Sequence, residues 1–395
     1  MFLLFIAIPA MMFADVVTEQ DALLKARQFM PGKSFEQPQK PNRAPARDGK
    51  IENPAYYVFN ATDNEGFVII SADDRTEAIL GYADNGYFDQ DNMPSNVKAW
   101  FEYYEQSIRS LGDAPAQVPQ QRTPHAAIEP LIQTMWYHGQ PYNLQCPKDG
   151  ENLTDAGDEA TAIAQVMYYH KWPVATTEAI PAYTTTDNLY VDALPPTTFR
   201  WDLMKNQYGS DAVGDSVNAV AELIRYCGQI NQMNYRTNNS YASTLLLDNI
   251  YRYFKYSGNM NYASRELFSN DRWEDLVYEE LINDRPVIYL GGWYYFICDG
   301  YDGNGLFHIN WGASGSGDGY YKLSILNWNY DGIEGGNNWN GYNSNQWIIQ
   351  GFAPAIDQEE LVPQVISYDV NISLSDYSRA STELDFESIS LSGSV

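Results

Sequence analysis

The segment "GDEATAIAQVMYYH" at residues 157–170 has the composition of a helix whose first turn lies close to another group. Small residues follow Gly157, and apolar residues then recur at helical spacing. A helix N-terminus stabilises negative charge, and an activated thiolate is commonly held there. The residue in that position is Asp158, followed by Glu159. A carboxylate suits the helix dipole but is a poor nucleophile toward an amide.

The three cysteines are candidates for a different nucleophile, and none has the expected surroundings. Cys146 precedes a proline in a polar loop and lacks a helix N-terminus of its own, so we expect a structural or idle thiol. Cys227 lies in an apolar helical pattern and Cys298 in a strand pattern, and both are predicted to be core residues. The odd count leaves at least one thiol unpaired and argues against a disulfide framework.

Three of the four histidines are predicted to have no catalytic role. His170 ends the helix at 157–170, where it can interact with the last carbonyl groups. His308 is a structural residue beside a sheet, and His125 lies in a linker and is solvated. The run "DGYDGNG" at 299–305 lacks the spaced acidic residues of an EF-hand, so we interpret it as a turn between strands.

The elements that must position these residues form an α+β domain over residues 131–356. The first half has helical periodicity and the second half has short β runs separated by Gly and Asp, which is typical of an antiparallel sheet. The helices are expected at 157–170, 213–234, 241–256 and 272–283.

A smaller α+β domain is predicted over residues 15–112. It has a helix at each end and a β-hairpin whose turn is Asp63 to Gly66, followed by a further strand. The expected elements are the helix 18–30, the hairpin 56–74, the strand 78–88 and the helix 94–111.

The remaining segments are predicted to lie outside the two domains. Residues 1–14 are almost wholly apolar and end in Phe-Ala, which fits a secretory signal peptide, although a buried strand is the alternative. Residues 113–130 are a protease-sensitive linker rich in Pro, Ala and Gln. Residues 357–395 are an acidic tail that either begins a third β domain or is disordered.

Composition limits the partners of the chain. Its 395 residues are 44% hydrophobic, enough for two domains with a substantial core. The formal net charge of -27 repels phosphate backbones and anionic lipid, so we expect neither nucleic acid nor a membrane as partner once the signal is removed. The oligomeric state is left open.

Several ordered stretches resemble the streptopain family, secreted bacterial cysteine endopeptidases with a papain-like fold that are made as zymogens. The stretches "GFVIISADDRTEAILGYADNGYF" and "PSNVKAWFEYYEQSI" are similar to the family propeptide and the related Spi-type inhibitor domain. The stretches "MWYHGQPYNLQCP", "ATAIAQVMYYHKWP" and "FICDGYDGNGLFHINWG" are similar to the peptidase domain. The resemblance implies a papain-like α+β fold behind a propeptide-like domain.

The catalytic positions of that family are substituted in this chain. In the family pattern Gly-Cys-Val-Ala-Thr-Ala, the nucleophilic Cys corresponds to Asp158. In Gly-His-Ala-Phe-Val-x-Asp-Gly, the base corresponds to Tyr294, and the loop before it is shorter than usual. The oxyanion Gln corresponds to His138, with Gln140 two residues further on, and the orienting Trp corresponds to Ala313.

The resemblance also brings four polar residues to one place. His138, Asp158, Glu159 and Tyr294 would form a new polar site in the family cleft. A histidine with two carboxylates can bind a metal, but an Asp–His ion pair needs none, and no HExxH-like or cysteine-rich spacing is present. We therefore predict no metal and no cofactor.

The leading functional hypothesis is a secreted pseudopeptidase that binds a peptide or protein in its cleft, or that inhibits an active related peptidase through residues 15–112. The first alternative is a working cysteine endopeptidase with an unrecognised nucleophile. The second is a surface interaction module. The sequence does not identify the binding partner, any residual activity, or whether the linker is cleaved.

Overall fold

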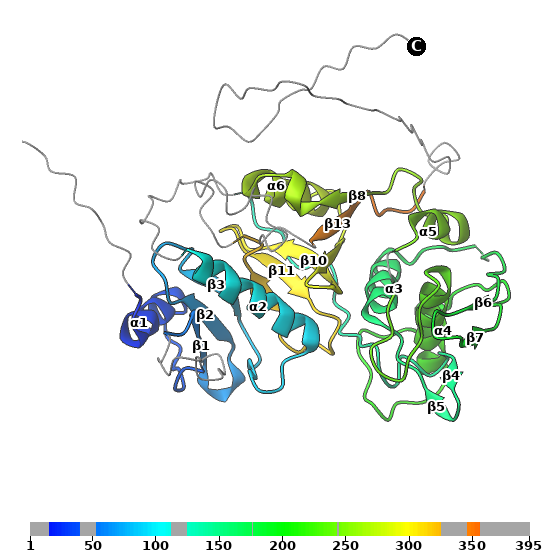
Figure 1. The fold of residues 1–395 in the computed structure, drawn as a ribbon, viewed down its shortest axis with the longest axis horizontal. Coiled ribbons are helices and arrows are strands. Elements are labelled where there is room, and N and C mark those ends of the chain that lie inside the picture. The colour runs from blue at the N-terminus through cyan, green and yellow to red at the C-terminus, as the bar shows by residue number, and fades with distance from the viewer. Residues whose placement is uncertain are drawn as a thin grey trace, which may run out of the picture. The chain divides into compact units, whose positions relative to one another are not determined.

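The computed structural model describes residues 16–39, 53–111, 125–175, 177–242, 245–324 and 346–355 (Figure 1). The predicted signal peptide, most of the predicted linker and the predicted tail lie outside these ranges. The described residues divide into two compact units. Unit 1 comprises the described residues up to Glu129 together with 301–309 and 316–324, and unit 2 comprises the remainder. No helix among the described residues is long and apolar enough to span a bilayer.

Unit 1 is an antiparallel sheet with the strand order β1-β2-β3-β12-β11. Its helices are those predicted, and the hairpin and the following strand are also present. The elements are α1 (Glu19–Phe29), β1 (Tyr56–Asn60), β2 (Phe67–Ser71), β3 (Ile79–Ala83), α2 (Ser95–Ser110), β11 (Phe307–Asn310) and β12 (Gly319–Tyr321), with the 3₁₀ turn Thr62–Asn64 between β1 and β2.

Strands β1 and β2 are buried along their whole length because both of their faces are covered. Tyr57 and Phe59 belong to the apolar cluster that takes in Ala22 and Ala26 of α1. Tyr56 points the other way, and its ring lies 5.2 Å from that of Phe101 on α2. Side chains alternate along a strand, so the continuous apolar sequence of these strands reflects a helix on each face.

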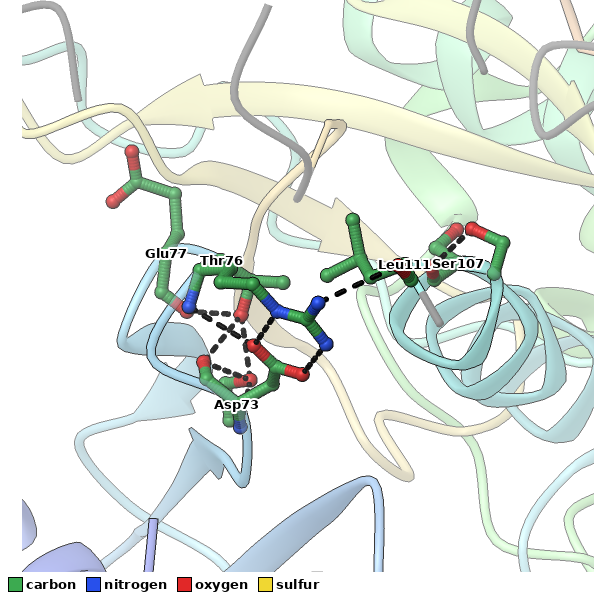
Figure 2. Close-up of polar contacts among 8 residues, drawn as sticks. Asp73, Thr76, Glu77, Ser107 and Leu111 are labelled. Atoms are coloured by element: carbon green, nitrogen blue, oxygen red, sulfur yellow. Dashed lines mark hydrogen bonds and ion pairs between the residues drawn. The ribbon is translucent and has the colours of Figure 1, made fainter. Parts of the chain in front are cut away.

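The connection from β2 to β3 is fixed by a charged turn (Figure 2). Asp73 accepts hydrogen bonds through Oδ1 from Arg75 Nε (2.8 Å) and through Oδ2 from Arg75 Nη2 (2.6 Å). The Thr76 hydroxyl donates to Ser71 Oγ at 2.6 Å, and Arg75 Nη1 also reaches the Leu111 carbonyl at 3.4 Å. A bidentate pair on a largely buried arginine is geometrically restrictive, and it sets where β3 begins.

Unit 2 combines helices with a four-stranded antiparallel arrangement in the order β10-β9-β13-β8. The helices are α3 (Asp158–His170), α4 (Asp215–Ile230), α5 (Leu247–Phe254) and α6 (Asn270–Leu281). The strands are β8 (Asn261–Ser264), β9 (Val287–Gly291), β10 (Tyr294–Tyr301) and β13 (Trp347–Gln350). Two small hairpins, β4 (Lys148–Asp149) with β5 (Asn152–Leu153) and β6 (Tyr183–Thr184) with β7 (Tyr190–Val191), and the 3₁₀ turns Trp201–Leu203 and Arg265–Leu267 complete the unit.

Helix α3 is the centre of the unit 2 core, with every residue from Glu159 to Met167 buried. It packs against α4, where a side-chain carbon added at Gly228 would meet the Tyr235 hydroxyl at 2.2 Å and Ala160 Cβ at 3.7 Å. The glycine is therefore required by Tyr235, whereas an added carbon would make only an ordinary van der Waals contact with Ala160 of α3. The small residues after Gly157 serve this packing as well as the helix start.

The predicted α+β class is confirmed, but two helices of unit 2 are shorter than the sequence suggested. The helix expected at 213–234 begins at Asp215 and ends at Ile230. The expected helix at 241–256 begins only at Leu247. Before it, Tyr241 pairs with Asn234 in an isolated bridge, and the Ala242 N–H donates to the Glu159 side chain at 2.8 Å. These long-range bonds hold residues 241 and 242 in an extended conformation, against their helical periodicity.

Candidate functional site

Asp158 begins helix α3 and is tied to the sheet half of unit 2. Its Oδ2 accepts the backbone N–H of Tyr295, the second residue of β10, at 2.6 Å. The preceding Gly157 has φ 85° and ψ 151°, which L side chains rarely adopt. A Cβ there would also lie 2.8 Å from Met233 Cε. Glycine is therefore required for the close approach that places Asp158.

Glu159 lies next to Asp158, and each of the two carboxyl groups affects the pKa of the other. The Glu159 side chain is buried, and its Oε1 accepts the Ala242 N–H. Burial, followed by the charge of Asp158, raises the pKa of Glu159 well above its usual value. With both groups ionised, Glu159 Oε2 has no donor, whereas a protonated Glu159 donates a hydrogen bond to Asp158. The raised pKa favours the protonated, uncharged form of Glu159 beside Asp158.

The pKa of Asp158 is also raised, mainly by burial. Three groups oppose that effect by favouring the ionised form: Glu159 as donor, the Tyr295 N–H and the positive charge that His138 can carry. Asp158 is therefore the member of the pair that accepts the Tyr295 N–H.

The side chain of Tyr295 is close enough to this pair for the two carboxyl groups to affect its pKa, and the sequence did not single it out. Its side chain is 5% exposed, and its pKa is raised first by burial and then by Tyr262, Glu159 and Asp158. The family pattern has alanine at this position, so a phenol occupies space beside the carboxyl pair where a methyl group would be expected. Tyr294 is half-buried, and adjacent strand residues point to opposite faces. The alternation of side chains along a strand could have indicated that Tyr295 faces away from the side on which Tyr294 lies.

The approach to Tyr294 is a two-residue hairpin turn. Tyr294 pairs with Gly291, and between them Gly292 and Trp293 have φ values of 59° and 71°. Positive φ at both central residues is the mark of a type I′ turn, among the shortest connections between antiparallel strands. The short loop predicted before Tyr294 is thus present as two residues, and its Trp293 is 76% exposed.

His138, the residue at the oxyanion position, pairs with an acid. Its Nδ1 lies 3.2 Å from Asp155 Oδ2, and its ring centroid is 4.1 Å from that of Tyr137. It is close enough to Asp158 to lower the pKa of that carboxyl. Gln140, two residues on, is exposed. An Asp–His contact is present, but its acid is Asp155 and not Asp158, the carboxylate that the sequence placed with His138.

Ala313 lies beside the same segment. It forms a backbone bridge with Tyr137, and the Ser314 N–H donates to the Trp136 carbonyl at 3.2 Å. The backbones of these positions lie near one another: Asp158 accepts the N–H of Tyr295, the residue after Tyr294, and Ala313 pairs with Tyr137, the residue before His138. The Tyr294 side chain points to the opposite face of β10 from that of Tyr295.

A buried amide network, missed by the sequence reasoning, holds these segments in place. Gln165 Oε1 accepts from Thr134 Oγ1 (2.7 Å) and from the Trp136 N–H (3.2 Å). Gln165 Nε2 donates to Asn310 Oδ1 (3.2 Å), and Asn310 Nδ2 donates to the Thr134 carbonyl (2.6 Å). One side chain of α3 thereby joins the segments that carry His138 and Ala313. Its polar character in an otherwise apolar helix was the available signal.

All three cysteines are buried thiols that form no disulfide. Burial raises the pKa of Cys146 to about 12 and those of Cys227 and Cys298 well above the usual value. A thiolate is the reactive form, so these surroundings disfavour nucleophilic chemistry at each of them.

The remaining histidines make structural contacts. His170 is half-buried, and desolvation lowers its pKa to about 4. Its Nδ1 lies 3.1 Å from the Tyr256 hydroxyl, which differs from the predicted contact with the end of its own helix. In unit 1, His308 pairs with Tyr320 across β11 and β12, and exposed His125 has its ring 6.3 Å from that of Tyr301.

The run at 299–305 ends strand β10 at Tyr301 and then turns toward β11, with Asp302 Oδ1 accepting the N–H groups of Asn304 (2.7 Å) and Leu306 (3.0 Å). Within the described ranges, no three His, Cys, Asp or Glu side chains are grouped in a way that could hold a metal ion.

Comparison with known proteins agrees with this architecture. The Peptidase C10 family model matches residues 136–321, and the Spi protease inhibitor model matches residues 14–108. Streptopain of Streptococcus pyogenes is 30% identical over 335 residues, which cover 78% of this chain and 82% of streptopain. The chain belongs to the Peptidase C10 family.

Two further C10-type relatives extend the comparison. The thiol protease/hemagglutinin PrtT of Porphyromonas gingivalis is 28% identical over 82% of this chain, which spans only 40% of the length of PrtT. The solved structure of a prointerpain A fragment from Prevotella intermedia superposes with a TM-score of 0.66 at 27% identity, covering 82% of this chain and all of the fragment. The papain-like fold with an N-terminal propeptide is thereby confirmed.

Proposed function

We propose that this C10-family chain is a pseudopeptidase, which does not hydrolyse peptide bonds and acts by binding another protein. The observation that carries the proposal is the Asp158–Glu159 pair at the start of α3, with Asp158 bonded to the Tyr295 N–H. A C10 cysteine peptidase requires a thiolate there. A carboxylate whose position is already fixed by a backbone donor is a poor nucleophile for an amide.

The other catalytic needs are also unmet. A phenol, with an ordinary pKa of about 10, is a poor general base at neutral pH, which argues against Tyr294 in that role. The imidazole of His138 is engaged by Asp155. An active cysteine endopeptidase would need Cys146, Cys227 or Cys298 as nucleophile, and burial opposes a thiolate at all three.

The choice between the two binding modes rests on Tyr295 and on the inhibitor match. The buried Tyr295 side chain and the Asp158 carboxylate held by the Tyr295 N–H favour a packed helix start over an open peptide site. The match of residues 14–108 to the Spi protease inhibitor favours inhibition of an active C10 peptidase in trans. The apolar segment 1–14 favours export, which would place the chain where such enzymes act.

Hydrolysis of a general protein substrate by the purified chain, with labelling by an epoxide cysteine-peptidase probe, tests the loss of activity. An active C10 peptidase is the positive control. We expect neither cleavage nor labelling, and we expect the chain to slow the control enzyme. Thiol-dependent cleavage that disappears in Cys146→Ser, Cys227→Ser or Cys298→Ser would overturn the proposal.

A further inference from the structure

Strand β3 is the outer strand of the inhibitor-like sheet, and in this chain its edge is already occupied. The occupant is β12, at the end of the segment matched by the Peptidase C10 model. The two strands are antiparallel, with Tyr320 opposite Tyr82 and Tyr321 opposite Gly81. Beyond β12, the Lys322 N–H donates to the Leu80 carbonyl at 3.0 Å. A peptidase-derived strand is thus bound by main-chain pairing within unit 1.

Two glycines make this pairing possible. A side-chain carbon added at Gly81 would lie 2.6 Å from Tyr321 Cδ1 and 2.9 Å from the Tyr320 carbonyl oxygen. One added at Gly319 would lie 2.6 Å from the Tyr82 carbonyl oxygen. Neither glycine has a positive φ, so the requirement comes from the neighbouring strand. We call the space over Gly81 that the Tyr321 ring fills the Gly81 slot.

Aromatic contacts hold β12 on both of its faces. Tyr321 is fully buried, with its ring edge-on to that of Phe101 at 6.1 Å. The buried Tyr104 hydroxyl lies 2.9 Å from the Leu80 carbonyl and 2.6 Å from the Lys322 carbonyl, so it bridges the two segments. On the other face, the rings of Tyr82 and Tyr320 stack at 5.1 Å. The edge of β3 therefore selects a strand of the form glycine, aromatic, aromatic.

We infer that the edge of β3, with its Gly81 slot, is the surface by which this chain recognises an active C10 peptidase, and that its own β12 competes for that surface. The occupant in trans is the enzyme's counterpart of β12, an extended Gly-aromatic-aromatic strand. This inference rests on the proposed inhibitory function. Because β12 is part of the same chain, its effective concentration at the edge of β3 is high. The intact chain therefore inhibits the enzyme more weakly than it would with the edge of β3 unoccupied.

Inhibition of an active C10 peptidase by full-length variants tests this inference. Tyr320→Ala removes a ring that only the competing strand supplies, so inhibition should strengthen by about three- to ten-fold, the range expected for one aromatic pair. Tyr82→Ala removes the same stacking from both the internal and the external complex, so inhibition should change little. Gly81→Val fills the slot for both occupants and should abolish inhibition.

Both tyrosines are only partly buried, so these two substitutions are mild, and thermal unfolding of each variant verifies its fold. Gly209→Val, in an exposed part of unit 2, is the control for a bulkier residue at a glycine. Two results would overturn the strand inference and leave the inhibitory function standing. One is an equal change of inhibition by Tyr320→Ala and Tyr82→Ala. The other is inhibition that persists in a folded Gly81→Val chain. A lack of inhibition by every chain, Tyr320→Ala included, would overturn the inhibitory function itself.

Discussion

The carboxylate of Asp158 and the backbone N–H of Tyr295 are joined at 2.6 Å, from the first residue of α3 to the second residue of β10. This bond connects the helical half of unit 2 to its sheet half at the start of α3, where we propose that the chain has lost the nucleophile of its family. We expect the Asp158 carboxylate to stabilise the fold, and its contribution to the free energy of unfolding can be measured.

Replacing Asp158 by alanine should leave the Tyr295 N–H without its acceptor. A buried unpaired donor costs about 1–3 kcal/mol, so we expect Asp158→Ala to reduce the free energy of unfolding by that amount. Asp158→Asn retains an oxygen acceptor and removes the charge next to Glu159, so it should be destabilised much less. Urea denaturation of the two variants provides the comparison, and equal losses would contradict a specific role for the bond.

The raised pKa of Glu159 gives stability a definite pH dependence. The folded state binds the Glu159 proton more tightly than the unfolded state, so this contribution is complete below the ordinary glutamate pKa and is lost as pH rises toward the folded value. Glu159→Gln keeps an acceptor for the Ala242 N–H and a donor toward Asp158 without a titrating proton. Wild type should therefore lose stability relative to Glu159→Gln as pH rises from about 4.5 to 8, at up to about 1.4 kcal/mol per pH unit.

Urea unfolding of both chains at several pH values measures that difference. Parallel stability curves would mean that Glu159 is ionised in the folded chain. Glu159→Gln also removes the acidic partner of Asp158, so the difference between the curves reports the titration of the pair.

The Gln165 network should be among the most sensitive polar features of unit 2. Gln165→Leu has a similar size but leaves the Trp136 N–H without its acceptor and removes partners of Thr134 and Asn310, so we expect a loss of roughly 2–5 kcal/mol. Gln145→Leu, whose amide bonds the Asn218 carbonyl at an exposed site, is the matched control and should cost under about 1 kcal/mol. Similar losses would argue against a structural role specific to the network.

The sequence predicted the elements and the substituted positions, because both depend on local pattern. Apolar periodicity located α3, and the quoted motifs located Asp158, His138, Tyr294 and Ala313. Contacts between residues far apart in the sequence could not be predicted from local pattern. The bond from Ala242 to Glu159 shortens α5 at its start, and it joins residues 83 positions apart. Tyr295 was overlooked because its importance lies in which face of β10 it occupies relative to α3.

Tyr295 also determines what would be needed to restore peptidase activity. Asp158→Cys alone should give no cleavage, because Tyr294 cannot act as an imidazole base and the Tyr295 phenol remains beside the new thiol. Adding Tyr294→His, His138→Gln and Ala313→Trp supplies a base, an oxyanion donor and an orienting indole. The Tyr295 phenol still remains beside the new thiol. We expect measurable labelling by an epoxide probe only when Tyr295→Ala is added as well.

Probe labelling of the four-fold and five-fold variants, followed by identification of the labelled residue, measures this difference directly. The five-fold variant with serine in place of the new cysteine is the control for labelling at Cys146 or another native thiol. Equal labelling with and without Tyr295→Ala would mean that the phenol does not obstruct the site. Cleavage by Asp158→Cys alone would mean that another residue of the chain already serves as the base.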